Sequence, residues 1–325
     1  MAGKVVTVFG ASGFVGRHVV RELASRGWRV RAAVRRPHLA QFLQPLGVVG
    51  QIQLTQANVR YRPSVAEAVE GADAVVNLVG ILAEEGQQSF EGVQAAGARN
   101  VAEMAAKAGI DQVVHVSAVG ADAESESEYA RTKADGENAF REHCPHATIL
   151  RPSIIFGPQD DFFNRFAAMS RTSPFLPLIG GGKTKFQPIY VDDVADSVAK
   201  VLSEPSLGGR TYELGGPEVK TFKELLQLML RIIGRRRALI PVPFPIATAM
   251  GQVGDAVSVL PFVKAPITAD QVVLLKQDNI VGISGEENIG TIEDLGVRPE
   301  TLEGVLPTYL VRFRKAGQFS PTVRV

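Results

Sequence analysis

Cysteine is almost absent from this chain, because Cys144 is the only one among 325 residues. A single thiol cannot form an internal disulfide, so the sequence excludes a disulfide-stabilised fold and fits a reducing compartment. Histidine is also scarce. His143 and His146 lie beside the cysteine at the end of a predicted helix, where such side chains typically face the helix dipole or solvent rather than a metal. We therefore predict no metal site.

A strong charge of either sign and a long apolar run are also lacking. The 35 basic and 34 acidic residues leave a formal net charge of +1, which argues against nucleic acid as a partner. The longest apolar candidate for a membrane span, residues 238–251, is interrupted by Pro241, Pro243 and Pro245. The first strand is predicted to start at about Lys4, which leaves no room for a signal or transit peptide. We expect a cytoplasmic bacterial protein or the mature form of an organellar one.

The most informative stretch is residues 4–16, KVVTVFGASGFVG. Its β-branched apolar residues are typical of a strand buried in a parallel sheet. Gly10, Gly13 and Gly16 follow at intervals of three, and an amphipathic helix pattern then ends at Gly27. A glycine turn between strand and helix lets the backbone approach a pyrophosphate at the positive end of the helix dipole. The pattern predicts a dinucleotide site, with a purely structural turn as the alternative.

Strand and helix patterns alternate through the first half of the chain. Further strands are predicted over residues 29–34, 51–57, 72–79, 112–117 and 147–151, and helices over residues 37–46, 63–70, 90–108 and 127–142. Repeated units of this kind predict an α/β fold with a doubly wound parallel sheet of the Rossmann type. The ligand is then expected at the carboxyl ends of the strands.

Beyond residue 152 the rhythm changes, and loops rich in glycine and proline appear. Residues 187–201 predict one more strand and helix that return to the main sheet. Residues 211–214 and 222–233 predict a strand and a helix of a smaller C-terminal lobe. The Rossmann domain is predicted over residues 1–155 and 186–204, and the smaller substrate- or partner-binding lobe over residues 156–185 and 205–325.

Two arginines, Arg35 and Arg36, follow the predicted second strand. Folds that prefer NAD usually carry an acidic residue here, which binds the ribose 2′-hydroxyl. A guanidinium group instead suits a 2′-phosphate, so we expect NADPH rather than NADH as the cofactor. The alternative is that both arginines are ordinary surface charges.

A Ser/Tyr/Lys set follows in the middle of the chain. Ser117 ends the predicted fifth strand, and Tyr129 and Lys133 share one face of the next helix. The ammonium group of Lys133 would favour the phenolate of Tyr129 and bind the nicotinamide ribose. Tyr129 would then exchange a proton with a substrate carbonyl or hydroxyl oxygen that Ser117 helps to hold. A tyrosine with a lysine four residues later is common by chance. The prediction of a joint Ser/Tyr/Lys site therefore depends mainly on the position of Ser117 at the end of a strand.

These motifs resemble those of the short-chain dehydrogenase/reductases, in their extended and atypical branches. The segment RPSIIFGPQDDFFNRFAAM, residues 151–169, narrows the resemblance. It is similar to the atypical reductases that include the nucleotide-binding accessory subunit, of the 39-kDa type, of respiratory complex I and its bacterial relatives. GASGFVGRHVV, YARTKADGE, FQPIYVDDVA and PVPFPIA extend the resemblance over nearly the whole chain.

The resemblance implies which residues contact the dinucleotide. The positions that match are Gly10, Ser12, Gly13, Phe14, Val15, Gly16, Arg35 and Arg36, with Tyr129 and Lys133 at the nicotinamide half and Pro152 beside it. Asn58 matches a polar position that covers the adenine ring, although a plain turn asparagine explains it almost as well. Val79, which ends the predicted fourth strand, completes the candidate cofactor-binding residues.

The resemblance also implies a function. It suggests a stable NADP(H) holder, an accessory or assembly subunit of NADH:ubiquinone oxidoreductase whose cofactor is mainly structural. The second lobe would contact the membrane surface or the quinone region of that complex, on the inner membrane of a bacterium or the matrix side of an organelle. The residues themselves add that the stretch 244–263 has modest amphipathic character, which suits a membrane surface or a partner, with a lid helix over the substrate lobe as the alternative. Because the Ser/Tyr/Lys set is complete, the other hypothesis is an active NADPH-dependent reductase, dehydrogenase or epimerase, or an enzyme of ubiquinone metabolism.

Overall fold

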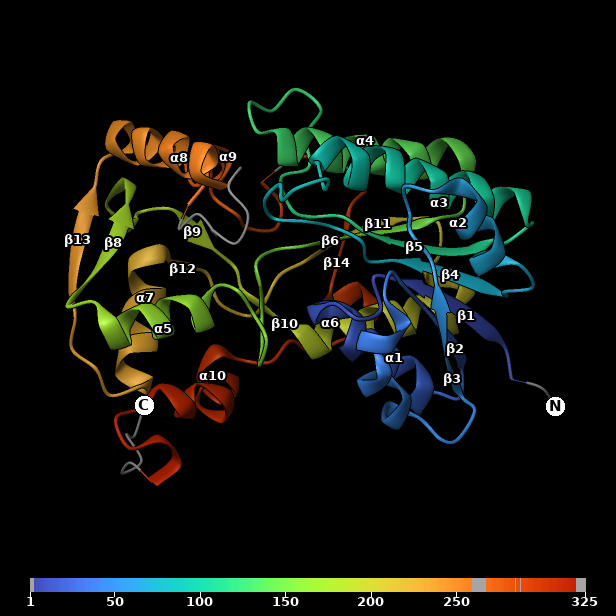
Figure 1. The fold of residues 1–325 in the computed structure, drawn as a ribbon, viewed down its shortest axis with the longest axis horizontal. Helices are drawn as coiled ribbons and strands as arrows, with labels where there is room; N and C mark the ends of the chain where they lie inside the picture. Colours follow the sequence, from blue (N-terminus) through green and yellow to red (C-terminus); the bar gives the residue numbers. More distant parts are fainter. Residues whose placement is uncertain (1–2, 259–266, 284, 287, 320–325) are drawn as a thin grey trace. The chain divides into compact units, whose positions relative to one another are not determined.

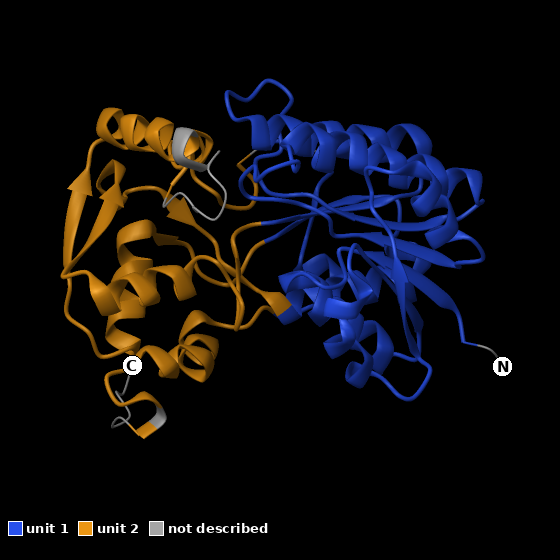
Figure 2. Ribbon diagram, in the orientation of Figure 1, with its two compact units in different colours: residues 1–152, 192–214, 285–298 blue, residues 153–191, 215–284, 299–325 orange. Residues whose placement is uncertain are grey.

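The computed structural model describes residues 3–258, 267–283, 285–286 and 288–319 (Figure 1). The chain divides into two compact units, shown in Figure 2. The first, here called the Rossmann unit, comprises Met1–Pro152, Asp192–Leu214 and Gly285–Arg298. The second unit comprises Ser153–Val191, Gly215–Ser284 and Pro299–Val325.

An eight-stranded parallel sheet forms the centre of the Rossmann unit, in the order β14-β11-β6-β5-β4-β1-β2-β3. Its strands are β1 Val5–Phe9, β2 Arg29–Val34, β3 Ile52–Gln56, β4 Ala74–Asn77, β5 Gln112–Val116, β6 Thr148–Pro152, β11 Thr211–Leu214 and β14 Gly290–Thr291. The order reverses beside β1, which lies between β2 and β4, and this reversal is the switch point of a doubly wound fold. The predicted fold class is confirmed.

Helices cover both faces of this sheet (Figure 1). One face carries α2 Arg62–Val69, α3 Ala96–Lys107 and α4 Glu128–His143, and the other carries α1 Phe14–Ser25 and α6 Val191–Ser203. The apolar faces of α2, α3 and α4 bury side chains such as Val65, Val101 and Phe140 against the sheet. On the opposite face, His18 Nδ1 of α1 lies 2.5 Å from Asp192 Oδ1 of α6. Burial of these helix faces is the main force that holds the layers together.

The predicted helix at residues 37–46 is wrong in type. The segment forms two 3₁₀-helices, Pro37–Leu39 and Gln41–Leu46. Pro45 lies inside the second of them and cannot donate a backbone hydrogen bond, which disfavours a regular α-helix. The predicted helix at residues 90–108 begins with a π-helical turn, Glu91–Ala95, before α3.

Two strands also join a different sheet from the one predicted. β10, Ile189–Tyr190, pairs with β7, Ile155–Phe156, instead of returning to the main sheet. β11, which was expected in the smaller lobe, lies between β6 and β14 in the main sheet. Both segments are short, with two and four residues, and so short a pattern does not indicate which sheet a strand joins.

The second unit has its own core, in which three helices pack together: α5 Phe163–Thr172, α7 Phe222–Ile232 and α10 Leu302–Leu310. A capping box between Thr221 and Glu224 starts α7. Tyr309 of α10 donates a hydrogen bond of 2.6 Å to Asp160, which ties this helix to the loop before α5. Burial raises the pKa of Asp160.

Small sheets and an outer helix pair complete the second unit. The sheets pair β8 Phe175–Ile179 with β13 Ala238–Val242, and β9 Lys185–Phe186 with β12 Lys220–Thr221. The amphipathic stretch predicted at residues 244–263 forms α8 Phe244–Ser258 and packs on α9 Ala269–Leu274, while residues 259–263 lie outside the described residues. Within the described ranges, no helix combines the length and apolar content that a membrane span requires.

The single cysteine gives a simple test of packing in the Rossmann unit. Cys144 follows α4 and donates from Sγ to the carbonyl oxygen of Ala102. Burial raises the pKa of its thiol to about 11. Because the thiolate is the reactive form, we expect iodoacetamide at pH 8 to alkylate the native protein about 100-fold more slowly than the urea-unfolded chain. Equal rates, followed by mass spectrometry, would contradict this packing.

Candidate cofactor-binding site

The turn between β1 and α1 has no room for side chains at two of its three glycines. Gly10 has a φ of +81°, and a Cβ there would lie 3.1 Å from the backbone of Leu78. A Cβ on Gly16 would lie only 2.1 Å from the carbonyl oxygen of Gly10. The first glycine therefore permits the turn, and the last lets α1 pack tightly against the end of β1.

The N-terminus of α1 is open to a ligand. Gly13 is its N-cap residue and supplies no side-chain cap to the first turn. The half-buried residues Ser12, Phe14 and Val15 surround this position. It lies at the carboxyl end of β1, at the switch point of the sheet. Backbone N–H groups and the helix dipole at such a point suit a pyrophosphate.

Val79 follows β4 and Pro152 ends β6, and β5 lies between these two strands in the sheet. The backbone nitrogen of Val79 would lie 3.3 Å from a Cβ on Gly10, so this residue borders the glycine turn directly. Pro152 ends β6, is buried, and accepts a hydrogen bond of 3.0 Å from Val119 N. Both residues therefore lie at the edge of the sheet where the fold places its ligand.

Arg35 and Arg36 come directly after β2, beside the glycine turn, and both side chains are exposed. Arg35 Nη1 donates to Gln88 Oε1 at 2.6 Å. Asn58 lies after β3, and its Oδ1 accepts a hydrogen bond of 3.2 Å from Arg60 N. This Asx turn is a local structural role for Asn58, in line with the alternative explanation of that residue.

The Ser/Tyr/Lys residues lie at the end of β5 and on the first turns of α4. Ser127 caps α4 by accepting a hydrogen bond from Ala130 N. This cap fixes where the helix begins and therefore where Tyr129 and Lys133 lie on it. Lys133 Nζ lies 5.9 Å from the centre of the Tyr129 ring. The same Nζ donates to the carbonyl oxygen of Val116 at 3.3 Å, next to Ser117. The structure thus brings Tyr129 and Lys133 together, with Lys133 at the end of the Ser117 strand.

Lys133 is buried, and its environment changes its proton affinity. Desolvation lowers its pKa from 10.5 to about 8, while the charge of Glu137 opposes this shift. The neighbouring His115 has a pKa well below its ordinary value, because burial and then the charges of Lys133 and Arg141 disfavour the imidazolium. His115 is therefore neutral at pH 7 and stacks on Phe140 with ring centres 4.4 Å apart.

A group of buried polar side chains that the sequence did not predict lies under this site. Asn77 contacts His115 Nδ1 at 3.1 Å, and Gln94 Nε2 donates to Thr132 Oγ1 at 3.1 Å. Gln94 Oε1, His115 Nε2 and Ser117 Oγ are buried and have no hydrogen-bond partner among the described residues. A signal was present, because Gln94 and His115 interrupt the otherwise apolar stretches GVQAAG and VVHVS.

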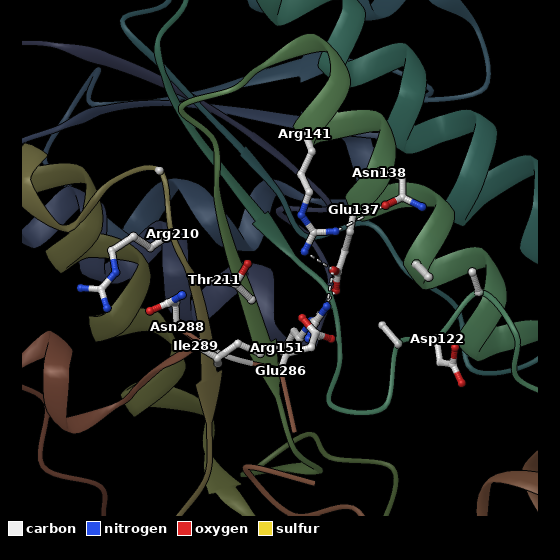
Figure 3. A pocket seen from close by; sticks show the side chains of 14 residues that line it. Asp122, Glu137, Asn138, Arg141, Arg151, Arg210, Thr211, Glu286, Asn288 and Ile289 are labelled. Carbon is white, nitrogen blue, oxygen red and sulfur yellow. Dashed lines mark hydrogen bonds and ion pairs between the residues drawn. The ribbon is translucent and has the colours of Figure 1, made fainter. Parts of the chain in front are cut away.

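A separate polar pocket of about 580 Å³ lies against α4, β6 and β11 (Figure 3). Its centre is the buried pair Arg151 and Glu137, joined by two hydrogen bonds of 2.8 Å. Burial alone would lower the pKa of Arg151, but its bonds to Glu137 and Glu286 raise it overall. Arg141 also bonds to Glu137. The pocket shares no lining residue with the candidate cofactor site, and its paired charges link α4 to β6.

The sequence is similar to that of known proteins over nearly its whole length. The sequence profile of the NAD dependent epimerase/dehydratase family matches residues 6–215. The mitochondrial NADH dehydrogenase [ubiquinone] 1 alpha subcomplex subunit 9 of Arabidopsis thaliana is 37% identical, over 99% of this chain and 81% of that protein. The mitochondrial NADH-ubiquinone oxidoreductase 40 kDa subunit of Neurospora crassa is 30% identical, over 98% and 82%. Ceramide reductase of Caulobacter vibrioides is 31% identical, over 79% of each chain.

Solved structures agree on the fold. UDP-glucose 4-epimerase of Thermus thermophilus, in complex with NAD, has a TM-score of 0.68 at 20% identity, over 96% of this chain and 99% of that one. NADPH-dependent quinone oxidoreductase of Escherichia coli, complexed with NADPH, has a TM-score of 0.67 at 21% identity, over 94% and 98%. At these identities the likeness establishes the fold alone, and the two solved proteins differ in the dinucleotide that they hold.

Proposed function

Because this chain belongs to the NAD dependent epimerase/dehydratase family and is homologous over nearly its whole length to subunits of NADH:ubiquinone oxidoreductase, we propose that it is an accessory or assembly subunit of that complex, respiratory complex I. The observation that carries the proposal is the 37% identity over 99% of the chain to the Arabidopsis subunit. In this role NADP(H) binds at the glycine turn and stabilises the Rossmann unit, since a ligand that binds only the folded state raises its stability.

NADPH is the proposed cofactor. The uncapped N-terminus of α1 suits the pyrophosphate, and the exposed Arg35 and Arg36 after β2 suit a 2′-phosphate. At the other end of the dinucleotide, Tyr129 and Lys133 would hold the nicotinamide ribose, with Pro152 beside it. The dinucleotide supplies hydride chemistry when bound, and this chain supplies its position.

The two arginines provide the test of this preference. We expect the double variant Arg35→Ala/Arg36→Ala to bind NADPH about 30-fold more weakly, because it loses charge-assisted contacts to the 2′-phosphate. NADH affinity should change by less than about 3-fold. Arg99→Ala, which removes an exposed arginine on α3, is the matched control. An equal loss for both dinucleotides in calorimetric titrations would contradict the assignment.

The second unit is the proposed contact with the membrane surface or the quinone region. Ile246, Met250 and Val253 of α8 are exposed at helical spacing, which supports a surface that another apolar body covers. The protein would then be peripheral, on the cytoplasmic side of a bacterial inner membrane or the matrix side of an organelle.

A native gel tests membership of the complex. Membranes are solubilised with a mild detergent, and the gel is probed for this chain and stained for NADH dehydrogenase activity. We expect the chain to migrate with the activity, and its deletion to shift the activity band or reduce it. Migration only at the mass of the free chain, with an unchanged activity band after deletion, would overturn the proposal.

An active reductase is the second candidate, supported by the complete Ser117, Tyr129 and Lys133 set and by the 31% identity to a ceramide reductase. In this role Tyr129 would donate a proton to a substrate carbonyl oxygen, and Ser117 would hold that oxygen. A sugar-nucleotide epimerase or an enzyme of ubiquinone metabolism would use the same residues. Loss of ubiquinone without loss of complex I in a deletion strain, rescued by the wild-type chain but not by Tyr129→Phe, would favour this candidate.

A further inference from the structure

The two compact units carry opposite net charges, although the whole chain is nearly neutral. The second unit has 16 basic and 9 acidic residues, whereas the Rossmann unit has 19 basic and 25 acidic residues. Their formal net charges are therefore +7 and −6. So uneven a distribution favours an anionic partner for the second unit and disfavours one for the Rossmann unit.

Many of these cations gather at one end of the second unit. The helices α5, α7 and α10 lie together there (Figure 1), and three arginines connect the last turns of α5 and α7 with the segment after α10. Each donates from Nε to a backbone carbonyl oxygen: Arg235 to Phe313 at 3.0 Å, Arg237 to Ser170 at 2.7 Å and Arg314 to Ile232 at 3.0 Å. The cations of this region, here called the arginine end, are Arg171, Arg231, Arg235, Arg236, Arg237, Arg314 and Lys315.

Capping of helix ends explains only part of the arginine end. The carbonyl groups at a helix C-terminus attract cations, and the three hydrogen bonds above serve such groups. The side chains of Arg171, Arg236 and Lys315 are exposed, and the described residues give them no hydrogen-bond or ion-pair partner. These three cations therefore have no structural role that the fold requires.

No carboxylate of the described residues forms an ion pair at the arginine end. The three segments that build it, residues 162–191, 225–254 and 304–319, contain no aspartate or glutamate. The ion pairs that the described residues form within the second unit all involve Lys220 instead. Because like charges that gather without counter-charges repel one another, this cluster suits an anionic surface outside the chain.

Exposed apolar side chains accompany the cations. Phe175 and Ile240 are 49% and 44% exposed and lie on one face of the β8–β13 pair, and β13 begins directly after Arg237. Phe319 is 85% exposed and follows Lys315 by four residues. At a membrane surface, cations of this kind meet lipid phosphates while apolar side chains enter the boundary of the acyl chains.

The composition of the arginine end favours a lipid surface over a protein. A protein interface has a core that is depleted of charge, with polar groups of both signs around it. A bilayer with acidic headgroups instead presents one sign of charge above an apolar interior. Six of the seven cations are arginines, whose planar guanidinium groups match the geometry of a phosphate better than an ammonium group does.

We propose that the arginine end binds the phosphate groups of anionic phospholipids at a membrane surface, with Phe175 and Ile240 in the headgroup region. This inference rests on the proposed membrane contact of the second unit, and it names the lipid class and the residues of that contact. The binding needs no other subunit, so the isolated chain can be tested.

Flotation of the full chain with lipid vesicles tests the proposal. We expect vesicles of phosphatidylcholine with about one third phosphatidylglycerol to bind the protein at least about 10-fold more tightly than vesicles of phosphatidylcholine alone. The variant Arg171→Gln/Arg236→Gln/Lys315→Gln removes three exposed cations that form no bond within the fold. It should bind the anionic vesicles about 100-fold more weakly, because each cation near such a surface contributes separately to the attraction.

The matched control removes the same number of exposed cations from the Rossmann unit. Arg29→Gln/Arg99→Gln/Lys107→Gln changes the net charge of the chain equally and should weaken binding by less than about 3-fold. An equal loss in both variants would mean that net charge alone drives the binding, and would overturn the assignment to the arginine end. Urea unfolding of both variants verifies that each is folded.

The lipid surface and membership of complex I can fail separately. A wild-type chain that migrates with the complex on the native gel but does not float with anionic vesicles would reject the lipid surface and leave membership intact. Loss of that co-migration in the arginine-end variant would then identify an acidic protein surface as the partner. A chain that floats with anionic vesicles, but never migrates with the complex, would reject membership and support the lipid surface.

Discussion

Replacement of Gly16 by alanine should destabilise the Rossmann unit by about 3 kcal/mol and abolish dinucleotide binding. The new Cβ would lie 2.1 Å from the carbonyl oxygen of Gly10 and 2.6 Å from that of Ala11. Both obstacles are backbone atoms, so no side chain can rotate away. α1 would have to move off the end of β1, and the turn that presents its N–H groups would open. Urea unfolding and NADPH titration measure the two effects.

Gly13→Ala is the matched control, because it adds the same methyl group three residues earlier in the chain. Its Cβ would lie 3.2 Å from the carbonyl oxygen of Gly10, and Gly13 is exposed with a φ of −72°, which any residue adopts. We expect its cost in unfolding free energy to stay below about 1 kcal/mol. If Gly16→Ala unfolds at the same urea concentration as Gly13→Ala, then Gly16 is not required for close contact between the helix and the turn.

The sheet and the glycine turn could be predicted from the sequence because their signals are local. The apolar run of β1, the glycine spacing and the amphipathic α1 lie within 25 residues and agree with one another. Parallel strands buried on both faces have continuous apolar sequences. Such sequences indicate that a strand is present, but they do not indicate which other strand it pairs with. The assignment of β11 to the smaller lobe failed because its partners in the sheet, β6 and β14, come from distant parts of the sequence.

The buried polar side chains could be noticed in the sequence but not interpreted. Gln94 lies in a helical pattern and His115 in a strand pattern, and neither residue disrupts the pattern enough to indicate a separate role. Their meaning depends on Asn77, Thr132 and Lys133, which lie between 18 and 38 residues along the chain from the side chains that they contact or influence. Only the three-dimensional packing of α3 and α4 over β4 and β5 brings these groups together.

Lys133→Met should make the ligand-free protein more stable but weaken its binding of NADPH. Burial holds the pKa of Lys133 at about 8, below its ordinary value of 10.5, so the folded state holds this proton less tightly than the unfolded chain. One pKa unit corresponds to about 1.4 kcal/mol, and the variant also loses the hydrogen bond to Val116. We expect the ligand-free variant to be about 2 kcal/mol more stable than the wild type at pH 7, and to bind NADPH at least about 10-fold more weakly.

The stability gained by Lys133→Met should depend on pH. Between pH 8 and 10.5 the unfolded chain binds more protons than the folded one at Lys133, so the stability of the wild type rises with pH over this window. The advantage of Lys133→Met should therefore be complete below pH 8 and vanish by about pH 10.5. Lys107→Met, at an exposed lysine on α3, should change stability by less than about 0.5 kcal/mol across the same range. A variant that is less stable than the wild type at pH 7, by urea unfolding without ligand, would mean that Lys133 supports the fold. The predicted result would mean that its burial costs stability and is retained for the ligand that it holds.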